Sequence, residues 1–248
     1  MYLLSRLSFA SLLLFALPGM LLAAGEKALR VAVLENSPPM AFRDASGELT
    51  GFSLGIMRAI CEEMRVRCEF SATTLDDVVD ALAGGEYDVA AVSLLDTPER
   101  RAKVLFAKPY FRSLSLWFAK PGLLPGQSGF RVAVVRGSAQ ERYVRSRGWD
   151  IVGVRTNAEL AEPLRAGLAK AAIIPMSSAL NLMKSPEFRD LGLSSTVMHD
   201  PELGGDASFG IAPQRPELKE QIDAALERIK RNGTYDRINS QYLPFRIN

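Results

Sequence analysis

The chain of 248 residues is 48% hydrophobic and 23% charged, a composition typical of a globular protein with a buried core. Its formal net charge is +2 and no run of Lys or Arg is longer than a pair such as Arg100-Arg101, so we expect no nucleic-acid partner. The single histidine, His199, argues against a Cys/His metal site, and we expect neither a metal nor a cofactor.

The amino-terminal segment differs from the rest of the chain. Met1–Arg6 carries one positive charge, Leu7–Leu22 is almost wholly apolar, and small residues follow at 23–25. This order is that of a secretory signal, so residues 1–24 are predicted to be a cleavable signal peptide. The apolar run is short for a membrane-spanning helix and contains Pro18, although an uncleaved anchor is the alternative. Because no cysteine follows, we expect no lipid anchor.

After this segment, strand patterns alternate with helical patterns. Ser53 is expected to cap a helix whose apolar positions recur at helical spacing. The predicted strands of this first half are Leu29–Leu34, Val66–Phe70 and Tyr87–Ser93, and a second helix is predicted at Asp76–Leu82. Such alternation implies βαβ units and a parallel sheet covered on both faces.

The alternation then restarts, which is compatible with two lobes, although periodicity alone also allows one larger sheet. Strands are predicted at Leu116–Ala119, Arg131–Val135, Ile151–Val154 and Ala171–Ile174, and helices at Ala139–Arg147, Ala158–Ala166 and Ser178–Met183. Pro216 opens a long amphipathic helix that Asn232-Gly233 ends. The arginines of the Ala139–Arg147 helix, Arg142 among them, are expected to be solvated.

Two cysteines, Cys61 and Cys68, fall on the apolar stripe of one helix and in the strand that follows. A helix-to-strand turn can bring two Cα atoms to about 5.5 Å, the usual separation in a disulfide. Because the chain carries an export signal, we predict a disulfide, with two buried thiols as the alternative.

The residues from Ser93 to Arg100 point to anion binding. A buried strand ends at Ser93, after which Thr97 can cap a helix with Pro98 at its first position and Arg100 in its first turn. This places a guanidinium beside free backbone N–H groups at the carboxyl end of a parallel sheet, where open α/β sheets bind ligands. Together these groups can bind a carboxylate. Taken alone, an arginine at a helix start is more often a solvated surface residue.

The order of motifs along the whole chain supports the interpretation of Arg100 as an anion-binding residue. The motifs are Pro38-Pro39, Gly47–Phe52, Tyr87–Val89, Thr97–Arg100, Tyr110, Arg136–Glu141, Phe209–Ala212 and Asn232–Asp236. In this order they resemble the bacterial extracellular solute-binding proteins of the polar amino-acid class, which are receptors of ABC importers. The Cys61–Cys68 spacing is also similar to a disulfide of the histidine- and lysine/arginine/ornithine-binding members.

The resemblance implies an α/β fold of the periplasmic-binding-protein (type II) kind, a clamshell of two lobes joined by a two-strand hinge. Each lobe is a mostly parallel sheet flanked by helices. Lobe one is expected to comprise residues 25–111 and 209–248, and lobe two residues 114–206. The implied protein is a periplasmic monomer that binds a small carboxylate and delivers it to an ABC permease in the inner membrane.

The resemblance also assigns roles to individual residues. Arg100 is expected to hold the ligand carboxylate, flanked by Ser93 and by the backbone of Leu95. Ser138 and Ala139, at a helix start in lobe two, are expected to offer backbone N–H groups to the same anion. Leu75 corresponds to an apolar base plate under the ligand side chain.

The chain departs from the family pattern where an amino-acid ligand's ammonium is bound. Pro175 stands where family members carry an acid on lobe two, and Ser53 and Gly55 replace a pair of acids. Glu35 is the one candidate for a substitute partner. The ligand is therefore expected to be an amino acid or a related organic acid.

Two other functions share this fold. One is a sensor or accessory receptor that serves no importer. The other is a dehydratase-type enzyme, which needs a general acid in the cleft. Pro175 occupies the natural position for that acid and no histidine lies in the motifs, so we expect a binding protein and not an enzyme.

Overall fold

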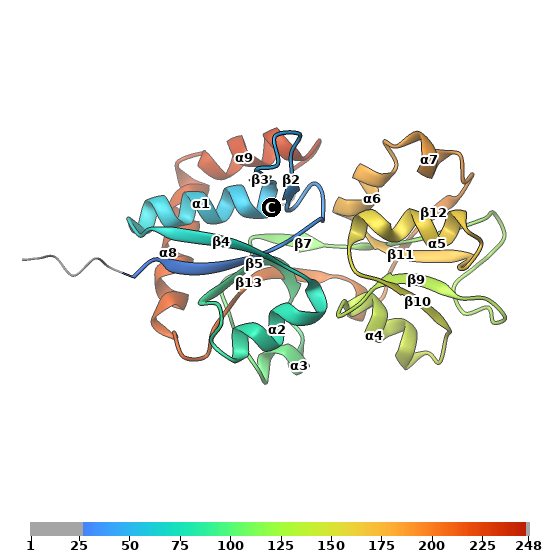
Figure 1. Cartoon of the computed structure of the whole chain (residues 1–248), viewed down its shortest axis with the longest axis horizontal. Helices are drawn as coiled ribbons and strands as arrows, with labels where there is room; N and C mark the ends of the chain where they lie inside the picture. Colours follow the sequence, from blue (N-terminus) through green and yellow to red (C-terminus); the bar gives the residue numbers. More distant parts are fainter. Residues whose placement is uncertain (1–26, 247–248) are drawn as a thin grey trace, which may run out of the picture.

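The computed structural model describes residues 27–246, so the predicted signal peptide lies outside the described residues. Two α/β bodies lie side by side along the longest axis (Figure 1). We call the body built on the six-stranded sheet lobe one and the body built on the five-stranded sheet lobe two. The predicted fold class is confirmed.

Lobe one is a mixed sheet with strand order β4-β1-β5-β13-β6, in which β7 also pairs with β13. Its strands are β1 (Leu29–Leu34), β4 (Cys68–Thr73), β5 (Val89–Leu95), β6 (Leu105–Phe106), β7 (Phe111–Ser113) and β13 (Gly205–Ile211). Strands β4, β1 and β5 are parallel, whereas β13 runs antiparallel to β5. A separate hairpin joins β2 (Phe42–Arg43) to β3 (Leu49–Thr50).

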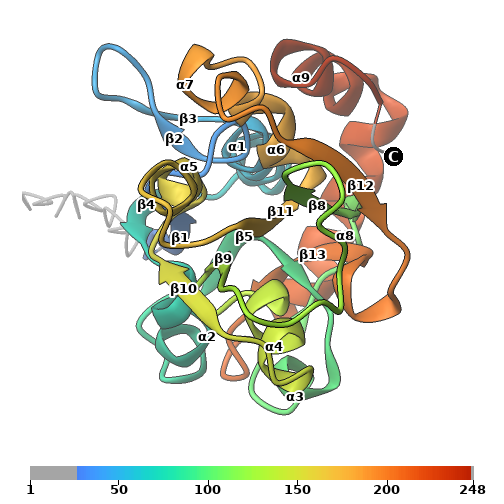
Figure 2. The same cartoon turned by 90° about the vertical axis from the view of Figure 1, so that its right-hand side faces the viewer.

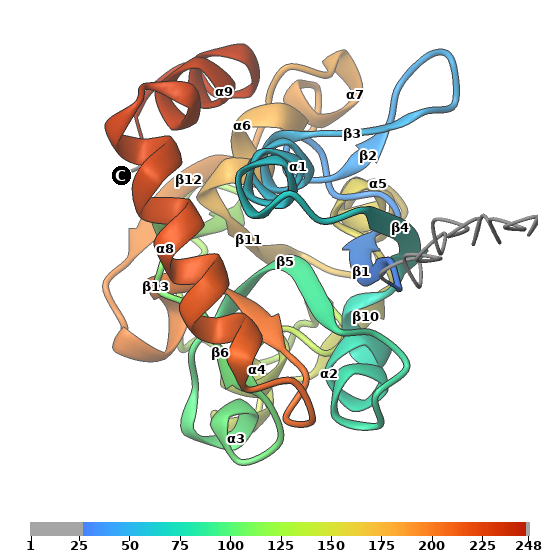
Figure 3. The ribbon, with the colours of Figure 1, turned by 90° about the vertical axis from the view of Figure 1, so that its left-hand side faces the viewer.

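Helices cover both faces of this sheet because alternate residues of its central strands point to opposite sides. Val31 and Val33 of β1 pack with α1 and α8, whereas Ala32 between them packs with α2. Figure 3 shows α8 crossing the sheet. The helices are α1 (Phe52–Met64), α2 (Leu75–Ala83), α3 (Pro98–Arg101), α8 (Glu217–Arg231) and α9 (Thr234–Tyr242).

Lobe two repeats this plan with strand order β10-β9-β11-β8-β12. Its strands are β8 (Ser115–Ala119), β9 (Val132–Val135), β10 (Ile151–Val154), β11 (Ala171–Pro175) and β12 (Ser194–Met198). Strands β10, β9 and β11 are parallel, and β8 is antiparallel to both β11 and β12.

The helices of lobe two also divide between the two faces of the sheet, with α4 on one face and α5 and α6 on the other (Figure 2). They are α4 (Ala139–Ser146), α5 (Ala161–Arg165), α6 (Met176–Leu182), α7 (Pro186–Arg189) and the 3-10 helices η1 (Asn157–Leu160) and η2 (Pro201–Leu203). Trp117 is buried against Phe130 and Trp149 on the α4 side, so it belongs to the core.

The chain passes between the lobes at two neighbouring places. Strand β7 continues through Leu114 into β8, and η2 leads through Gly204 into β13. The two segments are paired, with Ser113 opposite Gly205 in the antiparallel β7–β13 ladder. Two paired connections side by side form a narrow hinge region between two otherwise separate cores.

The predicted helix cap at Ser53 is wrong. Gly51 occupies the cap position of α1, with φ of 125° and ψ of 170°. A Cβ there would lie 2.5 Å from the backbone oxygen of Met40, so the close approach of two chain segments requires glycine. Ser53 lies inside the helix and directs its hydroxyl toward Tyr110.

The helix predicted at Ala158–Ala166 is present in two parts, the 3-10 helix η1 followed by α5. Pro163 lies inside this segment and has no N–H to donate to the carbonyl of Glu159. A continuous α-helical ladder therefore cannot extend through it, and only the residues from Ala161 onward form an α-helix.

The predicted disulfide between Cys61 and Cys68 is present, with a Cα–Cα distance of 6.3 Å. Arg65 makes the turn between the two cysteines in the left-handed conformation, with φ of 57°. The bridge ties the end of α1 to the start of β4. Among residues 27–246, no helix is long and apolar enough to span a bilayer.

Candidate functional site

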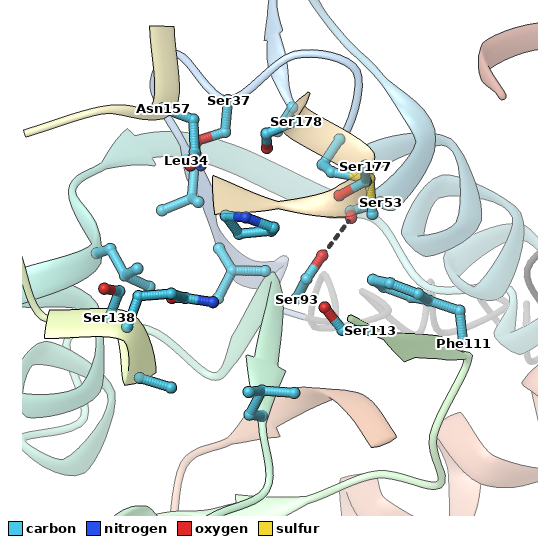
Figure 4. Close-up of a pocket in the computed structure, with 18 of the residues that line it drawn as sticks. Leu34, Ser37, Ser53, Ser93, Phe111, Ser113, Ser138, Asn157, Ser177 and Ser178 are labelled. Atoms are coloured by element: carbon cyan, nitrogen blue, oxygen red, sulfur yellow. Dashed lines mark hydrogen bonds between the residues drawn. The ribbon is translucent and has the colours of Figure 1, made fainter. Parts of the chain in front are cut away.

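A cavity of about 70 Å³ lies between the lobes. Its walls come from the carboxyl ends of β1 and β5 in lobe one and of β9 and β11 in lobe two, together with the loops that follow them. Ligands of open α/β sheets bind at this end of the strands. Figure 4 shows the serines that face the cavity from both lobes: Ser37, Ser53, Ser93, Ser113, Ser138, Ser177 and Ser178.

Arg100 is the buried cation of the cavity. Thr97 caps α3 by accepting the backbone N–H of Arg100 at 3.4 Å, and Pro98 occupies the first turn, as the sequence predicts. The Arg100 side chain donates from Nη1 to the Leu95 carbonyl at 3.1 Å and from Nη2 to the Gly137 carbonyl of lobe two at 3.0 Å. The residue is 4% exposed. These two bonds use two of its five N–H groups.

The charge of Arg100 is not matched by a carboxylate within the described part of the chain, because both of its hydrogen-bond partners are backbone carbonyls. Burial, with a smaller contribution from the nearby Arg142, lowers the pKa of Arg100 to about 10, while Glu99 opposes this shift. The group therefore stays protonated at neutral pH. A buried cation of this kind is a favourable partner for a ligand anion.

The turn before α4 brings lobe two against lobe one. Gly137 has φ of 71°, and a Cβ on it would lie 2.5 Å from the Cα of Asp76. Ser138 caps α4 by accepting the Glu141 N–H at 3.0 Å, and Glu141 accepts the Gly137 N–H at 2.7 Å. This reciprocal arrangement fixes the start of the helix.

The two predicted backbone donors of lobe two differ. Ser138 and Ala139 both line the cavity. The Ser138 N–H, however, donates to the Val135 carbonyl at 3.3 Å, so the turn itself engages this group. Ala139 is the first residue of α4, where N–H groups have no partner within the helix.

Three hydroxyl groups form a closed triangle on the lobe-one side. Tyr110 Oη lies 2.7 Å from Ser53 Oγ and 2.8 Å from Ser93 Oγ. The two serines are 3.3 Å apart, the contact that Figure 4 marks with a dashed line. Burial raises the pKa of Tyr110, so its hydroxyl stays protonated. Tyr110 packs in the core against Phe209, whereas the neighbouring Phe111 lines the cavity.

Asn157 is a buried polar residue of the cavity that the sequence reasoning missed. Its Nδ2 donates to Ser37 Oγ of lobe one at 3.1 Å, and its Oδ1 is buried without a hydrogen-bond partner among residues 27–246. Asn157 begins η1, three residues after the end of β10. Ser177 and Ser178 also lie within three residues of a strand end, that of β11, so polar residues shortly after a strand are the signal that could have identified Asn157.

Leu75, Leu95 and Pro175 line the cavity, but Glu35 does not. Glu35 is exposed and points toward Arg155 of lobe two, with 3.8 Å between the charged atoms. The structure therefore does not bring Glu35 to the site as an ammonium partner. Its neighbour Leu34, the last residue of β1, lines the cavity instead, whereas Glu35 lies beyond the end of the strand.

Ion pairs connect the lobes around the rim. Arg142 lies 3.1 Å from Glu99, and Arg136 lies 3.4 Å from Asp76. The expectation that Arg142 is simply solvated is wrong, because the start of α4 carries this side chain onto lobe one. No group of three or more His, Cys, Asp or Glu side chains able to hold a metal occurs in the part of the chain that the structure covers.

Comparisons of the sequence and of the structure with known proteins all find solute-binding proteins. The model of the bacterial extracellular solute-binding proteins, family 3, matches residues 29–245. The lysine/arginine/ornithine-binding periplasmic protein of Escherichia coli (strain K12) is 26% identical over 236 residues, 91% of each chain. The histidine-binding periplasmic protein of Salmonella typhimurium (strain LT2) is 25% identical over 252 residues, 97% of each chain. The structure of an ancestral arginine-binding protein bound to arginine superposes with a TM-score of 0.77 at 27% identity, covering 88% of this chain and 99% of that one.

Proposed function

Because the chain belongs to family 3 of the bacterial extracellular solute-binding proteins, we propose that it captures a small carboxylate-bearing ligand between its lobes and delivers it to an ABC importer. The two relatives described above are both binding proteins, in agreement with the expected function without catalysis. The chain is a solute-binding protein and not an enzyme.

The observation that carries the proposal is the buried Arg100. Two of its N–H groups donate to the carbonyls of Leu95 and Gly137, which leaves three for a carboxylate. A buried ionised group without a counter-charge is unfavourable, so a ligand anion that supplies one gains binding free energy. Ser93 and the Ala139 N–H would flank the anion, and Leu75 would support the rest of the ligand.

Closure of the two lobes would complete this site. Arg100 comes from lobe one, and its Gly137 contact comes from lobe two. We propose that residues 25–111 and 209–248 move as one body, that residues 114–206 move as the other, and that the paired hinge segments bend between them. A ligand that contacts both bodies favours the closed form by its differential affinity for that form.

The cellular setting is part of the same proposal. The two relatives are periplasmic proteins, and we propose that residues 1–24 direct this chain to the periplasm as a monomer without a lipid anchor. There it would meet the permease at the inner membrane. Cells that lack the protein should lose uptake of the ligand at low external concentration, and uptake that is unchanged would contradict the importer role.

The ligand-binding role is tested by a thermal-shift screen of amino acids and organic acids, followed by calorimetry of the best ligand. At 100 times its Kd, a ligand should stabilise the protein by about 2.7 kcal/mol. Arg100→Ala should weaken binding by about 2–5 kcal/mol, because a buried charge contact is lost.

Arg101→Ala is the matched control. Arg101 is the next residue of α3, but its side chain is exposed and paired with Asp96. The Arg101→Ala variant should bind the ligand with the affinity of the unmodified protein. Unchanged affinity in Arg100→Ala would show that Arg100 is structural and would refute the assignment of the site.

A further inference from the structure

We propose that the ligand is a small carboxylate whose second polar group is an uncharged hydroxyl and not an ammonium, with Asn157 Oδ1 as the acceptor of that hydroxyl. This inference rests on the proposed function and specifies the class of ligand. It separates this chain from a receptor for amino acids.

The first step concerns the charges around the cavity. Arg100 is the one charged side chain among the described residues that line it, and every other polar lining side chain is a neutral serine, Gln140 or Asn157. An ammonium enclosed here would meet no carboxylate of the described lining residues, because the ligand's own carboxylate would be bound by Arg100. Enclosing a second cation of this kind is unfavourable, because ionised groups need a counter-charge when they leave water.

Three acids of lobe one are engaged with arginines of lobe two outside the cavity. Glu35 faces Arg155, Asp76 faces Arg136 and Glu99 faces Arg142. None of the three acids contributes to the cavity wall. Each would have to leave an arginine of the opposite lobe to reach a ligand ammonium, and the contacts between the lobes would be lost in the same movement.

The second step concerns Asn157. This side chain is 7% exposed and lines the cavity, and its Oδ1 is a buried acceptor that no described group satisfies. Its orientation is held from the other end, where Nδ2 donates to Ser37 Oγ at 3.1 Å. Buried carbonyl oxygens in native proteins generally have a donor. A ligand hydroxyl supplies this donor without adding charge.

The third step concerns size. The cavity of about 70 Å³ is well below the roughly 300–1,000 Å³ of pockets for larger ligands. Leu34, Leu75 and Phe111 add apolar surface, and no described lining carboxylate could receive a basic side chain. The enclosed space therefore suits an acid of a few carbon atoms.

Calorimetry with matched pairs of acids tests the proposal on the unmodified protein. The pairs are glycolate with glycine, L-lactate with L-alanine, and 3-hydroxybutyrate with 3-aminobutyrate, so that the two members of each pair differ only in hydroxyl or ammonium. In the pair that binds best, the hydroxy acid should bind at least about tenfold more tightly, the factor that corresponds to about 1.4 kcal/mol. A smaller preference, or tighter binding of the amine, overturns the proposal.

The outcomes also separate this proposal from the one on which it rests. If the amine binds more tightly and the binding depends on Arg100, the carboxylate site stands and the hydroxyl assignment fails. If none of the six acids binds and the wider screen of carboxylates is also negative, both proposals fail.

Asn157→Asp tests the position of the acceptor. It places a carboxylate where the amide oxygen now lies, so L-alanine should gain at least tenfold in affinity while L-lactate does not. Gln140→Glu is the control, because it adds the same charge at another buried residue of the cavity wall, whose Nε2 donates to Ser115. An equal gain of L-alanine affinity in both variants would overturn the role of Asn157. Circular dichroism melts establish that both variants are folded.

Discussion

The two lobes have similar architecture but contribute different chemistry to the cavity between them. Lobe one supplies the only charged lining side chain of the described residues, Arg100, and a triangle of buried hydroxyls around Tyr110. Among the described residues, lobe two lines the cavity with neutral side chains such as Asn157, and its Gly137 carbonyl accepts a hydrogen bond from Arg100. In the proposed function, lobe one would provide the charge that holds the anion, whereas lobe two would close over it and bind the rest of the molecule.

After Arg100→Ala, the largest loss of affinity is expected where lobe two meets lobe one. Gly137→Ala places a Cβ within 2.5 Å of the Asp76 backbone, so the lobes cannot approach as closely. Ligand affinity should fall by up to about 3 kcal/mol, the usual upper range for overpacking. Calorimetry measures the loss, and small-angle scattering should show a more open molecule in the presence of ligand.

Gly148→Ala separates closure from backbone strain. Gly148 also has a positive φ, 70°, but a Cβ on it would meet nothing within 4 Å. This variant should lose stability without losing affinity. An equal loss of affinity in both variants would contradict the role of the Gly137 contact.

A second effect tests the framework of lobe one away from the cavity. Asp88 accepts hydrogen bonds from the backbone N–H and the guanidinium of Arg30, and it pairs with Arg215 at 3.3 Å. Asp88→Asn should lower the free energy of unfolding by about 2 kcal/mol, the scale of hydrogen bonds to charged groups. Urea denaturation at pH 7 measures this loss.

The same interaction predicts a pH dependence. Burial raises the pKa of Asp88, but the hydrogen bonds from Arg30 outweigh burial, so the net pKa lies below its ordinary value of 3.8. The stabilisation is therefore complete above that ordinary value and is lost as the pH falls through the folded-state pKa. The stability difference between the unmodified protein and Asp88→Asn should shrink on acidification below pH 4, and a constant difference would contradict the assignment.

A third and smaller effect concerns the hydroxyl triangle. Tyr110→Phe removes the central oxygen and leaves Ser53 and Ser93 with each other at 3.3 Å. We expect a loss of about 1 kcal/mol in unfolding free energy, the typical contribution of one hydrogen bond. Thermal denaturation measures this loss. Tyr110→Phe should reduce ligand affinity less than Gly137→Ala does. A larger loss of affinity in Tyr110→Phe would show that lobe one does more than hold the anion.

The smallest effect is expected at the rim. The ion pairs Arg136–Asp76 and Arg142–Glu99 join the lobes at partly exposed positions. Pairs of this kind contribute about 0.2–1 kcal/mol and are screened by salt. Arg136→Ala should therefore reduce the salt dependence of ligand binding relative to the unmodified protein, as measured by calorimetry at several salt concentrations. An unchanged salt dependence would remove Arg136 from the closing contacts.

Much of the architecture was predictable because it is encoded locally. The apolar run Leu29–Leu34 forms β1 with the predicted bounds, and the Thr97-Pro98 cap places Arg100 in the first turn of α3. Apolar periodicity and cap chemistry act over a few residues, so they can be read without knowing what else packs nearby. The division into two sheets was left open by periodicity, and the resemblance to a family was needed to predict it.

The sequence by itself determined the alternating elements, the disulfide and the arginine of the short helix that follows β5. Only the tertiary structure decided which polar groups meet in the cavity. Asn157 and Ser37 are 120 residues apart and come together from different lobes. Leu34 and Glu35 are adjacent, yet Leu34 lines the cavity and Glu35 faces Arg155. The physical reason is that apolar periodicity and cap chemistry act over a few residues, so they do not record which groups from distant segments come together.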